Sequence, residues 1–433
     1  MTVLQLPVAA DVTRNASTPT SKVAPLLGAE RMRNGGEPKL KLGGGVSWIT
    51  KYQIEPGGIR KVLWKKRITA GPATVSSGVA TDSSGNVLVA GRADDAVGGS
   101  RQSFTHAFVS KYSPGGILSW TKQLSSASYD YASNVATDKR GNVLISGFTM
   151  GSLKGPNKGG IDAWVAKYNA AGSLLWIRQL GTASDEVSRD VGVDSAGNVL
   201  ITGYTLGALK GTNLGGSDAW AAKYSPSGKL LWLRQWGTTT NDESSGLATD
   251  SNDNLYILGQ ILRVPRGPLP GDYDVFLTKY SPTGTRLWTQ ELDSSADDES
   301  ARIAIDHKGN VVISGWTNGV LGGSSKGGYD AFSAKYSPTG TQLWVKQLGS
   351  VENDGCTAIT TDNNDNIFTA GWTDGALAGP SYGGYSDAWV AQFSQFGKQL
   401  WVHQEGTTGE DRFTGVATDT LNHVFLTGHT WGR

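Results

Sequence analysis

The chain repeats itself every 56 residues, and this period constrains its fold more than any other feature. The first anchor is a tryptophan, preceded by leucine in six copies, with a last step of 57 residues: Trp64, Trp120, Trp176, Trp232, Trp288, Trp344 and Trp401. The second anchor is a turn aspartate with the same steps: Asp82, Asp138, Asp194, Asp250, Asp306, Asp362 and Asp419. A glycine follows nine residues after each aspartate, and a Lys-Tyr pair recurs in six copies and becomes Gln392-Phe393 in the last. Four anchors therefore indicate seven copies of one unit.

Each unit contains four short segments typical of β-strands. In successive copies these are DAWVAKY (162–168), SLLWIRQL (173–180), SRDVGVD (188–194) and VLITGYT (199–205). They are rich in β-branched and aromatic residues and are bounded by Gly, Asn, Asp and Ser. No segment has a capped helical period. Four strands in each of seven radial repeats predict an all-β fold, a single seven-bladed β-propeller with four-stranded blades.

The order of the segments predicts how the ring closes. The chain begins with SWITKY (47–52) and VLWKKR (62–67), which correspond to the third and outer strands of a blade. It ends with TGVATD (414–419) and VFLTGHT (424–430), which correspond to the inner and second strands. We therefore expect the N-terminal strands to complete the C-terminal blade, which removes the open edges that an incomplete ring would expose.

These motifs resemble the bacterial seven-bladed β-propeller repeat (SBBP) family. The resemblance is carried by Asp162 to Tyr168, Asp218 to Tyr224 and Asp330 to Tyr336, by the Leu-Trp strands, and by the turn Ala136 to Val143. It covers roughly residues 46–433 and implies the propeller fold and a binding platform. The repeat is also similar to the propeller domains of cyanobacterial alkylating enzymes that form cyclophanes. Those enzymes carry a calcium-binding N-terminal domain whose G-G-x-G-x-D-x repeat is absent here, and no catalytic residue carries over.

Composition limits the partners and the setting. Lys plus Arg is 39 and Asp plus Glu is 38, so the net charge is +1. This balance lacks the excess of positive charge that is typical of proteins that bind nucleic acid. No apolar run is long enough for a membrane span, and residues 1–13 lack the features of a signal peptide. Residues 1–45 lack the repeat and predict a disordered leader or linker before a propeller at 46–433. We expect a monomer, cytoplasmic by default.

Strand alternation places two kinds of connection at opposite ends of the ring. The inner-to-second and third-to-outer turns are short and uniform, whereas the other end carries the inter-blade connections and long loops such as 205–219. Variable loops on a rigid scaffold are where binding usually occurs. Loops 92–107 and 260–274 depart most from the repeat. Two explanations are open for these loops. They recognise a specific ligand, or their sequences vary because nothing constrains them.

Two repeated positions at the long-loop end are candidate ligand-binding residues. Ten residues after most Leu-Trp tryptophans stands an acid: Asp130, Glu186, Asp242, Asp298, Asp354 and Asp411. The residue after the repeat glycine is aromatic or histidine in five copies: Phe148, Tyr204, Trp316, Trp372 and His429. Such a set suits a cation, a sugar or a peptide. The alternative is that each acid bonds the backbone N–H groups of its own turn.

Signals for catalysis and metal binding are weak. The five histidines do not repeat in phase, and no G-x-S-x-G, P-loop or H-E-x-x-H motif is present. DSNDN (250–254) and DNNDN (362–366) begin like a calcium loop but lack its glycine and distal glutamate. We therefore expect no cofactor or metal, with Ca²⁺ as the one candidate. The predicted function is a scaffold that recognises a small molecule, sugar, peptide or protein partner on the long-loop face; the alternative is an enzyme with a carboxylate from the acidic ring as general base.

Overall fold

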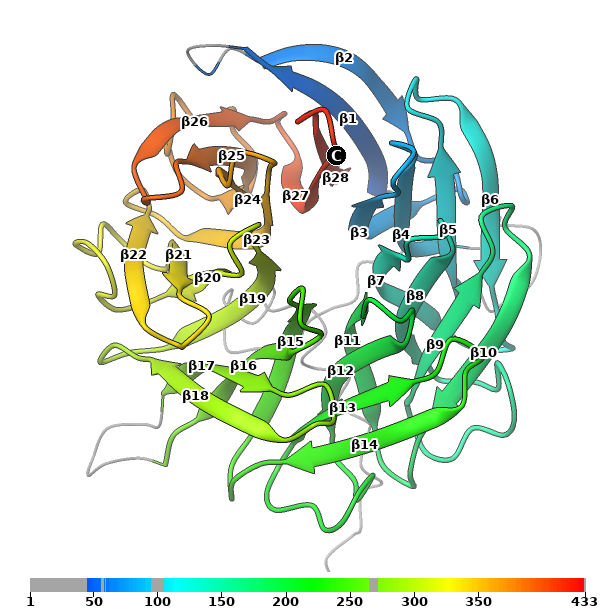
Figure 1. Cartoon of the computed structure of the whole chain (residues 1–433). Coiled ribbons are helices and arrows are strands. Elements are labelled where there is room, and N and C mark those ends of the chain that lie inside the picture. Colours follow the sequence, from blue (N-terminus) through cyan, green and yellow to red (C-terminus); the bar gives the residue numbers. More distant parts are fainter. Residues whose placement is uncertain (1–44, 56–57, 59, 95–103, 265–271, 432–433) are drawn as a thin grey trace, which may run out of the picture. The chain divides into compact units, whose positions relative to one another are not determined.

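The computed structural model describes residues 45–55, 58, 60–94, 104–264 and 272–431. These residues form seven four-stranded antiparallel sheets, and no helix occurs among them. Figure 1 shows the sheets as blades around a common centre, with one strand of each blade innermost. The prediction of a seven-bladed propeller with four-stranded blades is confirmed.

Each blade starts at the centre of the ring and runs outward. The inner strands are β3 (Thr74–Thr81), β7 (Asp130–Thr137), β11 (Glu186–Val193), β15 (Asp242–Thr249), β19 (Asp298–Ile305), β23 (Asp354–Thr361) and β27 (Glu410–Thr418). The second strands are β4 (Val87–Asp94), β8 (Val143–Thr149), β12 (Val199–Thr205), β16 (Leu255–Leu262), β20 (Val311–Thr317), β24 (Ile367–Thr373) and β28 (Val424–Trp431). Blades 1 to 6 begin at β3, β7, β11, β15, β19 and β23, and blade 7 contains β27.

The outward half of each blade contains the two remaining anchors. The third strands, which carry the Lys-Tyr motif, are β1 (Gly45–Ile54), β5 (Thr105–Tyr112), β9 (Asp162–Tyr168), β13 (Asp218–Tyr224), β17 (Tyr273–Tyr280), β21 (Asp330–Tyr336) and β25 (Asp387–Phe393). The outer strands, which carry the Trp motif, are β2 (Arg60–Arg67), β6 (Leu118–Leu124), β10 (Leu174–Leu180), β14 (Leu230–Trp236), β18 (Arg286–Leu292), β22 (Gln342–Leu348) and β26 (Gln399–Glu405).

Blade 7 is built from both ends of the chain. Its strand order is β2-β1-β28-β27, and Trp48 of β1 lies opposite Gly428 of β28. The ammonium of Lys51 also lies 3.4 Å from a carboxylate oxygen of Asp419, the aspartate of the β27–β28 turn. The predicted ring closure is therefore confirmed.

The Lys-Tyr and turn-aspartate anchors form one buried ion pair in each of six blades. The lysine of the third strand reaches the aspartate between the inner and second strands, and both side chains are nearly inaccessible. The pairs besides the closing one are Lys111–Asp82, Lys167–Asp138, Lys223–Asp194, Lys279–Asp250 and Lys335–Asp306, at 2.8 to 3.3 Å. In blade 6 the lysine is replaced by Gln392, whose amide oxygen instead accepts the indole N–H of Trp401.

Five of the seven anchor tryptophans join their blade to the next. Trp176 in β10 donates its indole N–H to the carbonyl of Pro226, which lies in the β13–β14 turn of blade 3, at 2.9 Å. Trp64, Trp120, Trp288 and Trp344 make the same bond to the following blade. Because most of these indoles are only partly buried, they are contacts between blades rather than centres of the core.

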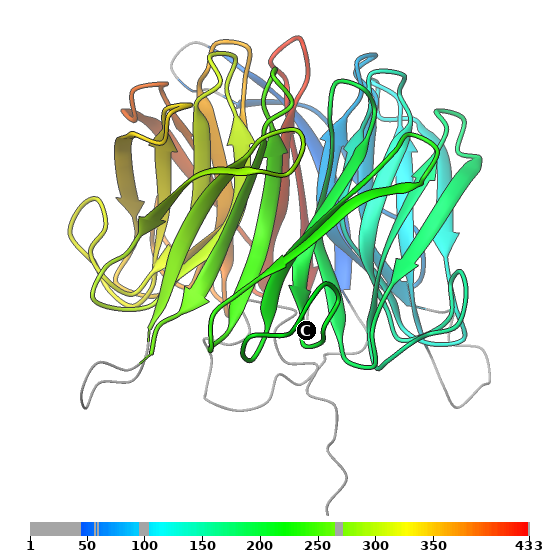
Figure 2. The same cartoon turned by 60° about the horizontal axis from the view of Figure 1, so that its bottom comes forward.

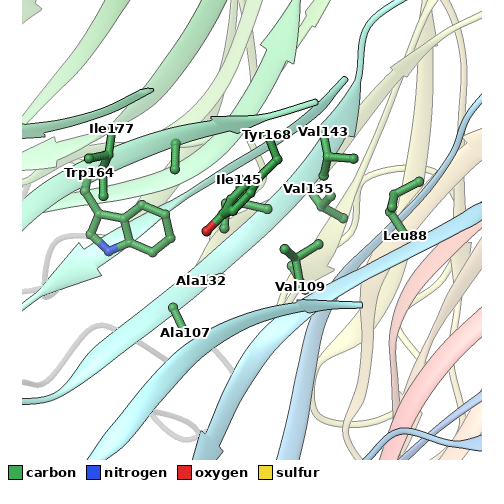
Figure 3. Packing of buried hydrophobic residues seen from close by; sticks show 12 residues of the cluster. Leu88, Ala107, Val109, Ala132, Val135, Val143, Ile145, Trp164, Tyr168 and Ile177 are labelled. Carbon is green, nitrogen blue, oxygen red and sulfur yellow. The ribbon is translucent and has the colours of Figure 1, made fainter. Parts of the chain in front are cut away.

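The core lies between the faces of neighbouring blades. Every residue of β9, DAWVAKY, is buried, because a third strand is covered by a blade on each side. Figure 3 shows Leu88 and Val109 of blade 1 packed with Val135, Ile145 and Trp164 of blade 2. One cluster thus spans two blades, and the ring is held together by the same apolar contacts that stabilise each sheet.

The two ends of the ring differ as the alternation predicts. In Figure 2 the short turns lie at the top and the longer loops at the bottom. Inner strands begin at the long-loop end and run to the turn aspartates at the other, tight-turn end. Residues at the start of the inner strands and at the end of the second strands therefore surround one mouth of the central channel.

Candidate functional site

The six acids of the predicted ring lie together at the long-loop mouth. Five of them open an inner strand, and Asp411 is the second residue of β27. All six are buried, with exposed fractions of 3% or less. The structure thus brings these acids to one level of the channel.

Each of these acids is held by its own inter-blade turn. The backbone N–H four residues earlier donates to the carboxylate, as from Ser126 to Asp130 at 2.6 Å and from Ser350 to Asp354 at 2.6 Å. The same bond joins Thr182 to Glu186, Thr238 to Asp242, Ser294 to Asp298 and Thr407 to Asp411. This geometry favours the structural alternative, and ligand binding by the acids stays a proposal.

Burial shifts the titration of these carboxyls. Loss of solvent raises the pKa of Asp298 and of Asp354 to about 6, although hydroxyl and backbone N–H donors partly offset it. The same cause raises the pKa of Asp130, Glu186 and Asp242. Asp298 and Asp354 therefore tend toward the neutral form in mildly acidic solution.

The predicted aromatic residues are buried between the inner strands and the next layer. Phe148, Tyr204, Trp316 and Trp372 are exposed by 5% or less, and His429 by 9%. Each lies opposite the inner-strand residue that follows the ring acid of the same blade. Phe148, for example, lies opposite Tyr131, and the two rings stack with their centres 4.5 Å apart. These side chains are therefore buried within the ring rather than extended into solvent.

A positively charged group occupies blades 7 and 1 at this level. The guanidinium of Arg92 in β4 lies 5.4 Å from the ring centre of Tyr131, and that of Arg412 in β27 lies 4.8 Å from that of Trp372. His429 lies on the strand beside Arg412. Burial, and then the charges of Arg412 and Arg92, lower the pKa of His429 to about 3, so the imidazole is neutral.

A negatively charged group lies across the ring. Glu243 of β15 and Glu299 of β19 follow the ring acids directly, and both are more than nine-tenths buried. Arg189 of β11 approaches Glu243 at 3.8 Å and covers the ring of Tyr204. The charged residues at this level thus differ from blade to blade, and both groups have counter-charges nearby: Arg412 pairs with Glu410 at 3.0 Å, and Glu243 lies near Arg189.

Further along the inner strands, buried hydrogen bonds join blades 2, 3 and 4. Asn134 donates to Asp190 at 2.5 Å, and the backbone N–H of Leu247 donates to the other carboxylate oxygen at 2.8 Å. Burial raises the pKa of Asp190, although the charge of Arg302 opposes this. Gly246 stands between Asp190 and Arg302 along the ring, so no side chain separates the two charges there.

Sequence reasoning missed Arg412, Glu243 and Glu299 because they do not repeat. The available signal was the position itself, one residue after the ring acid, where the seven copies carry five residue types: Val75, Tyr131, Val187, Glu243, Glu299, Gly355 and Arg412. In a chain whose frame is this regular, variation at one inward-facing position indicates a place that the frame does not require.

The long loops of four blades are anchored by a recurrent glutamine. Gln179 in β10 donates to the carbonyl of Gly151 and to Asp162, and accepts the N–H groups of Leu153 and Lys154. Gln235, Gln347 and Gln404 repeat this arrangement. The divergent loops 92–107 and 260–274 lie partly outside the described residues; Arg263, in the described part, pairs with Asp274 and Glu291.

The two calcium-like turns have internal donors. In DSNDN, one oxygen of Asp250 accepts the N–H groups of Asn252 and Asn254, and the other faces Lys279. Asp253 instead accepts the N–H of Ser195 in the preceding blade. No group of three metal-ligating side chains occurs in the part of the chain that the structure describes. Calcium binding at these turns stays untested.

Comparison with known proteins agrees with this architecture. The β-propeller repeat (SBBP) family profile matches residues 119–153, 175–209 and 343–377. A WD repeat-containing protein of Acanthamoeba polyphaga mimivirus is 25% identical over 75% of this chain and 31% of its own length. The regulatory protein FlaEY of Caulobacter vibrioides is 26% identical over 60% of this chain and 32% of its own. The chain thus spans about a third of the length of these relatives.

Solved propellers share the general shape at low identity. The WD40 domain of Pan2 from Neurospora crassa is 10% identical, with a TM-score of 0.40 over 69% of this chain and 88% of that one. A polysaccharide lyase of family PL25 is 9% identical, with a TM-score of 0.46 over 79% and 88%. Among the described residues, no helix is long and apolar enough to cross a membrane. The chain is a seven-bladed propeller, and three of its segments match the profile of the β-propeller repeat (SBBP) family.

Proposed function

We propose that this propeller is a binding scaffold that recognises a ligand or a protein partner at the long-loop mouth of its channel. The observation that carries the proposal is the break in symmetry at one level. The frame repeats its ion pairs and turn bonds almost without change, whereas the residues just inside the ring acids include Arg92, Arg412, Glu243 and Glu299. Repetition serves folding, so the variation just inside the ring acids favours recognition there.

The buried charges support the same proposal. Charged side chains are rarely buried unless they are paired or serve a function. Glu299 and Arg412 lie on inner strands of different blades, so a ligand at the mouth would meet acidic and basic groups on different sides. The enzyme alternative needs a ring carboxylate as general base. Because all six carboxylates already accept backbone N–H groups, the geometry gives that alternative less support.

The test is a thermal-shift screen of the full chain against sugars, metabolites and short peptides, followed by titration of each hit. Arg92→Gln and Glu299→Gln alter the mouth, and Arg140→Gln is the matched control because Arg140 is exposed in a turn at the opposite end. We expect a ligand whose affinity falls at least tenfold in a mouth variant and is unchanged in the control. Ligands that bind equally to all variants, or that depend on Arg140, would contradict the proposal.

A further inference from the structure

The exposed charges in the turns of the tight-turn end are all positive. Among the described residues of these turns, no aspartate or glutamate is exposed, whereas five basic residues are: Lys139, Arg140, Lys229, Lys308 and Lys398. The turn aspartates are buried, and six of them are paired with a lysine. The exposed acids of the described chain lie toward the long-loop end: Glu291, Asp293 and Glu352. The net charge of +1 therefore conceals one basic end.

Counter-charges at this end are few. Lys308 lies 3.7 Å from the buried carboxylate of Asp365, and the half-buried Asp253 accepts hydrogen bonds from Ser195. Glu55 is the other half-buried acid in the described turns. Within the described ranges of the chain, Lys139, Arg140 and Lys398 form no ion pair. Their charges therefore face solvent without a partner acid.

Three turns at the same end carry a large apolar side chain in water. Ile117 is 73% exposed, Phe396 is 79% exposed and Leu421 is 75% exposed. They belong to blades 1, 6 and 7, which are consecutive in the ring. Leu421 lies in a turn beside the channel, whereas Ile117 and Phe396 lie in turns toward the outer strands. Figure 2 shows these short turns together at one end of the ring, so the three side chains and the cations share one face.

These apolar residues depart from the repeat. In the described turns of the other blades, the same positions carry small, polar or charged residues, and Ile59 of blade 7 lies outside the described residues. Each has a serine as its counterpart in another blade: Ser173 for Ile117, Ser227 for Phe396 and Ser84 for Leu421. The turns thus form without an apolar residue, and a side chain that stays in water gains little from folding. The apolar residues therefore suit a contact outside the chain.

We propose that the tight-turn end of blades 6, 7 and 1 docks on an anionic lipid bilayer, with Phe396, Leu421 and Ile117 inserted among the lipid headgroups. Interfacial binding combines buried apolar side chains with the attraction of Lys and Arg to anionic lipids. Lys398 follows Phe396 in the same turn, and Lys308 donates to Gln395 of that turn at 2.5 Å. This surface goes beyond the proposed function, because it lies at the opposite end and leaves the long-loop mouth facing solution.

The distribution of the apolar residues favours a bilayer over a protein or a nucleic acid. The three side chains come from turns of three different blades, and the turns between them carry serine, asparagine and glycine. A protein interface needs a contiguous, closely packed core, whereas a fluid bilayer accepts separate side chains. Nucleic acid would use the cations through its phosphates and would leave the aliphatic side chains without a role. Dependence on the apolar residues therefore distinguishes the partners.

The experiment is flotation of the full chain with large unilamellar vesicles. One set contains phosphatidylcholine alone, and the other contains phosphatidylcholine mixed with phosphatidylserine. We expect the chain to float with the phosphatidylserine vesicles and to stay in solution with phosphatidylcholine. Flotation should weaken as salt is added, because salt screens exposed charges.

Two pairs of variants decide whether flotation reports this face. Phe396→Ser, which introduces the serine of blade 3, should lower the partition coefficient about tenfold because it removes a buried aromatic ring. Val351→Ser is its matched control, because Val351 is 77% exposed at the long-loop end. The double variant Lys139→Gln and Arg140→Gln should also lower partitioning by about tenfold or more. Its control is Lys154→Gln with Lys158→Gln, two exposed lysines of a long loop.

Several results would overturn the proposal. Flotation that is equal with both kinds of vesicle, or that Phe396→Ser and Val351→Ser reduce equally, would exclude docking through this face. If duplex DNA or polyglutamate binds as tightly as the vesicles and Phe396→Ser has no effect, the face recognises a nucleic acid or an acidic protein instead. Glu299→Gln at the mouth should leave flotation unchanged, so the scaffold and the docking face stand or fail separately.

Discussion

The two ends of the propeller use aspartate in opposite electrostatic settings. At the tight-turn end, Asp138 accepts hydrogen bonds from Asn142 and meets the ammonium of Lys167 at 3.0 Å. Burial opposes its charge, but these partners outweigh burial and hold the pKa of Asp138 below its usual value. At the long-loop end, Asp354 is buried with only neutral donors, and burial raises its pKa to about 6.

This difference separates two parts of the molecule. The frame is the set of repeated Lys–Asp ion pairs at the tight-turn end, and the mouth is the long-loop end that carries the six ring acids. A buried carboxylate with its own lysine is fully charged and fixed in place, and five further copies of the pair repeat around the ring. A buried carboxylate without a cation is held only by hydroxyl and N–H groups, and its charge depends on pH. The tight-turn end therefore stabilises the ring, whereas the long-loop end has room for residues that vary between blades.

The largest expected effect comes from removing a lysine of the frame. Lys167→Met leaves Asp138 buried without its cation, and the free energy of unfolding should fall by about 3 to 5 kcal/mol. Urea denaturation measures this loss. Lys139→Met, at an exposed position in the adjacent turn, is the matched control and should change stability by less than about 0.5 kcal/mol.

Blade 6 provides a second check on the same pair. Its natural residue at the lysine position is Gln392, so the frame tolerates an amide there. Lys167→Gln should therefore cost less than Lys167→Met. Equal losses in the two variants would show that an amide does not replace the ammonium as a partner of Asp138 in blade 2.

The next effect concerns pH at the mouth. The pKa of Asp354 is about 6 in the folded state and near 3.8 when unfolded, so the folded state binds the proton more tightly. Its contribution to stability is therefore fully present below the unfolded pKa and is lost as the pH rises through about 6. Asp354→Asn should remove on the order of 1 to 2 kcal/mol of the stability gained between about pH 7 and about pH 5.

The lysine-paired aspartates of the frame and the acids of the mouth should lose their contributions to stability at different pH values. The pKa values of the lysine-paired aspartates, including Asp138 and Asp306, are lowered, so their contribution is present above the unfolded pKa and is lost only as the pH falls below it. Unfolding free energies measured across the acidic range separate the two groups. Identical pH profiles for the wild type and Asp354→Asn would contradict the role of burial at the mouth.

Much of the fold was predictable because it repeats. The seven tryptophans, the turn aspartates and the split between 47–67 and 414–430 specify the blade count and the closing strands, and the structure confirms both. The Lys–Asp ion pair was not predicted, although both residues were counted as anchors. Their common phase was available, but only the strand order shows that the third strand brings its lysine beside the turn of the same blade.

The site was less predictable because the residues that distinguish it depart from the repeat. The acids and aromatics were identified at the correct end, but their burial depends on cross-strand register, such as Phe148 opposite Tyr131. The position of the Trp372 indole depends on Gly355, a residue 17 positions earlier, and no local pattern joins the two. The repeat can be recognised in a single sequence, whereas the contacts of the positions that differ between blades cannot.

A smaller effect tests how neighbouring blades are joined. Trp176→Phe removes the N–H that bonds Pro226 and should lower the free energy of unfolding by about 1 kcal/mol. Trp232→Phe is the matched control, because the indole N–H at that position has no acceptor among the described residues. If both variants lose the same stability, the packing of the indole, and not its hydrogen bond, joins the blades.

The smallest effect concerns the turns that lack glycine. Asp253 has a φ of 61° and accepts hydrogen bonds from Ser195 of the preceding blade. Asp253→Gly loses these bonds but adopts this φ without strain, so the two effects should nearly cancel, within about 0.5 kcal/mol. Asp253→Ala loses the bonds and keeps the strain, and should be less stable by about 1 kcal/mol. Equal stabilities of the two variants would contradict this account.

The most direct test of the difference between the two ends is the titration of individual aspartates. Carboxyl ¹³C signals of Asp138 and Asp354, assigned with Asp138→Asn and Asp354→Asn, report each group in the intact protein. We predict that Asp354 titrates near pH 6 and that Asp138 titrates below its ordinary value. If both titrate at the same ordinary value, or if Asp354 titrates below Asp138, the contrast between a charged frame and a desolvated mouth is wrong.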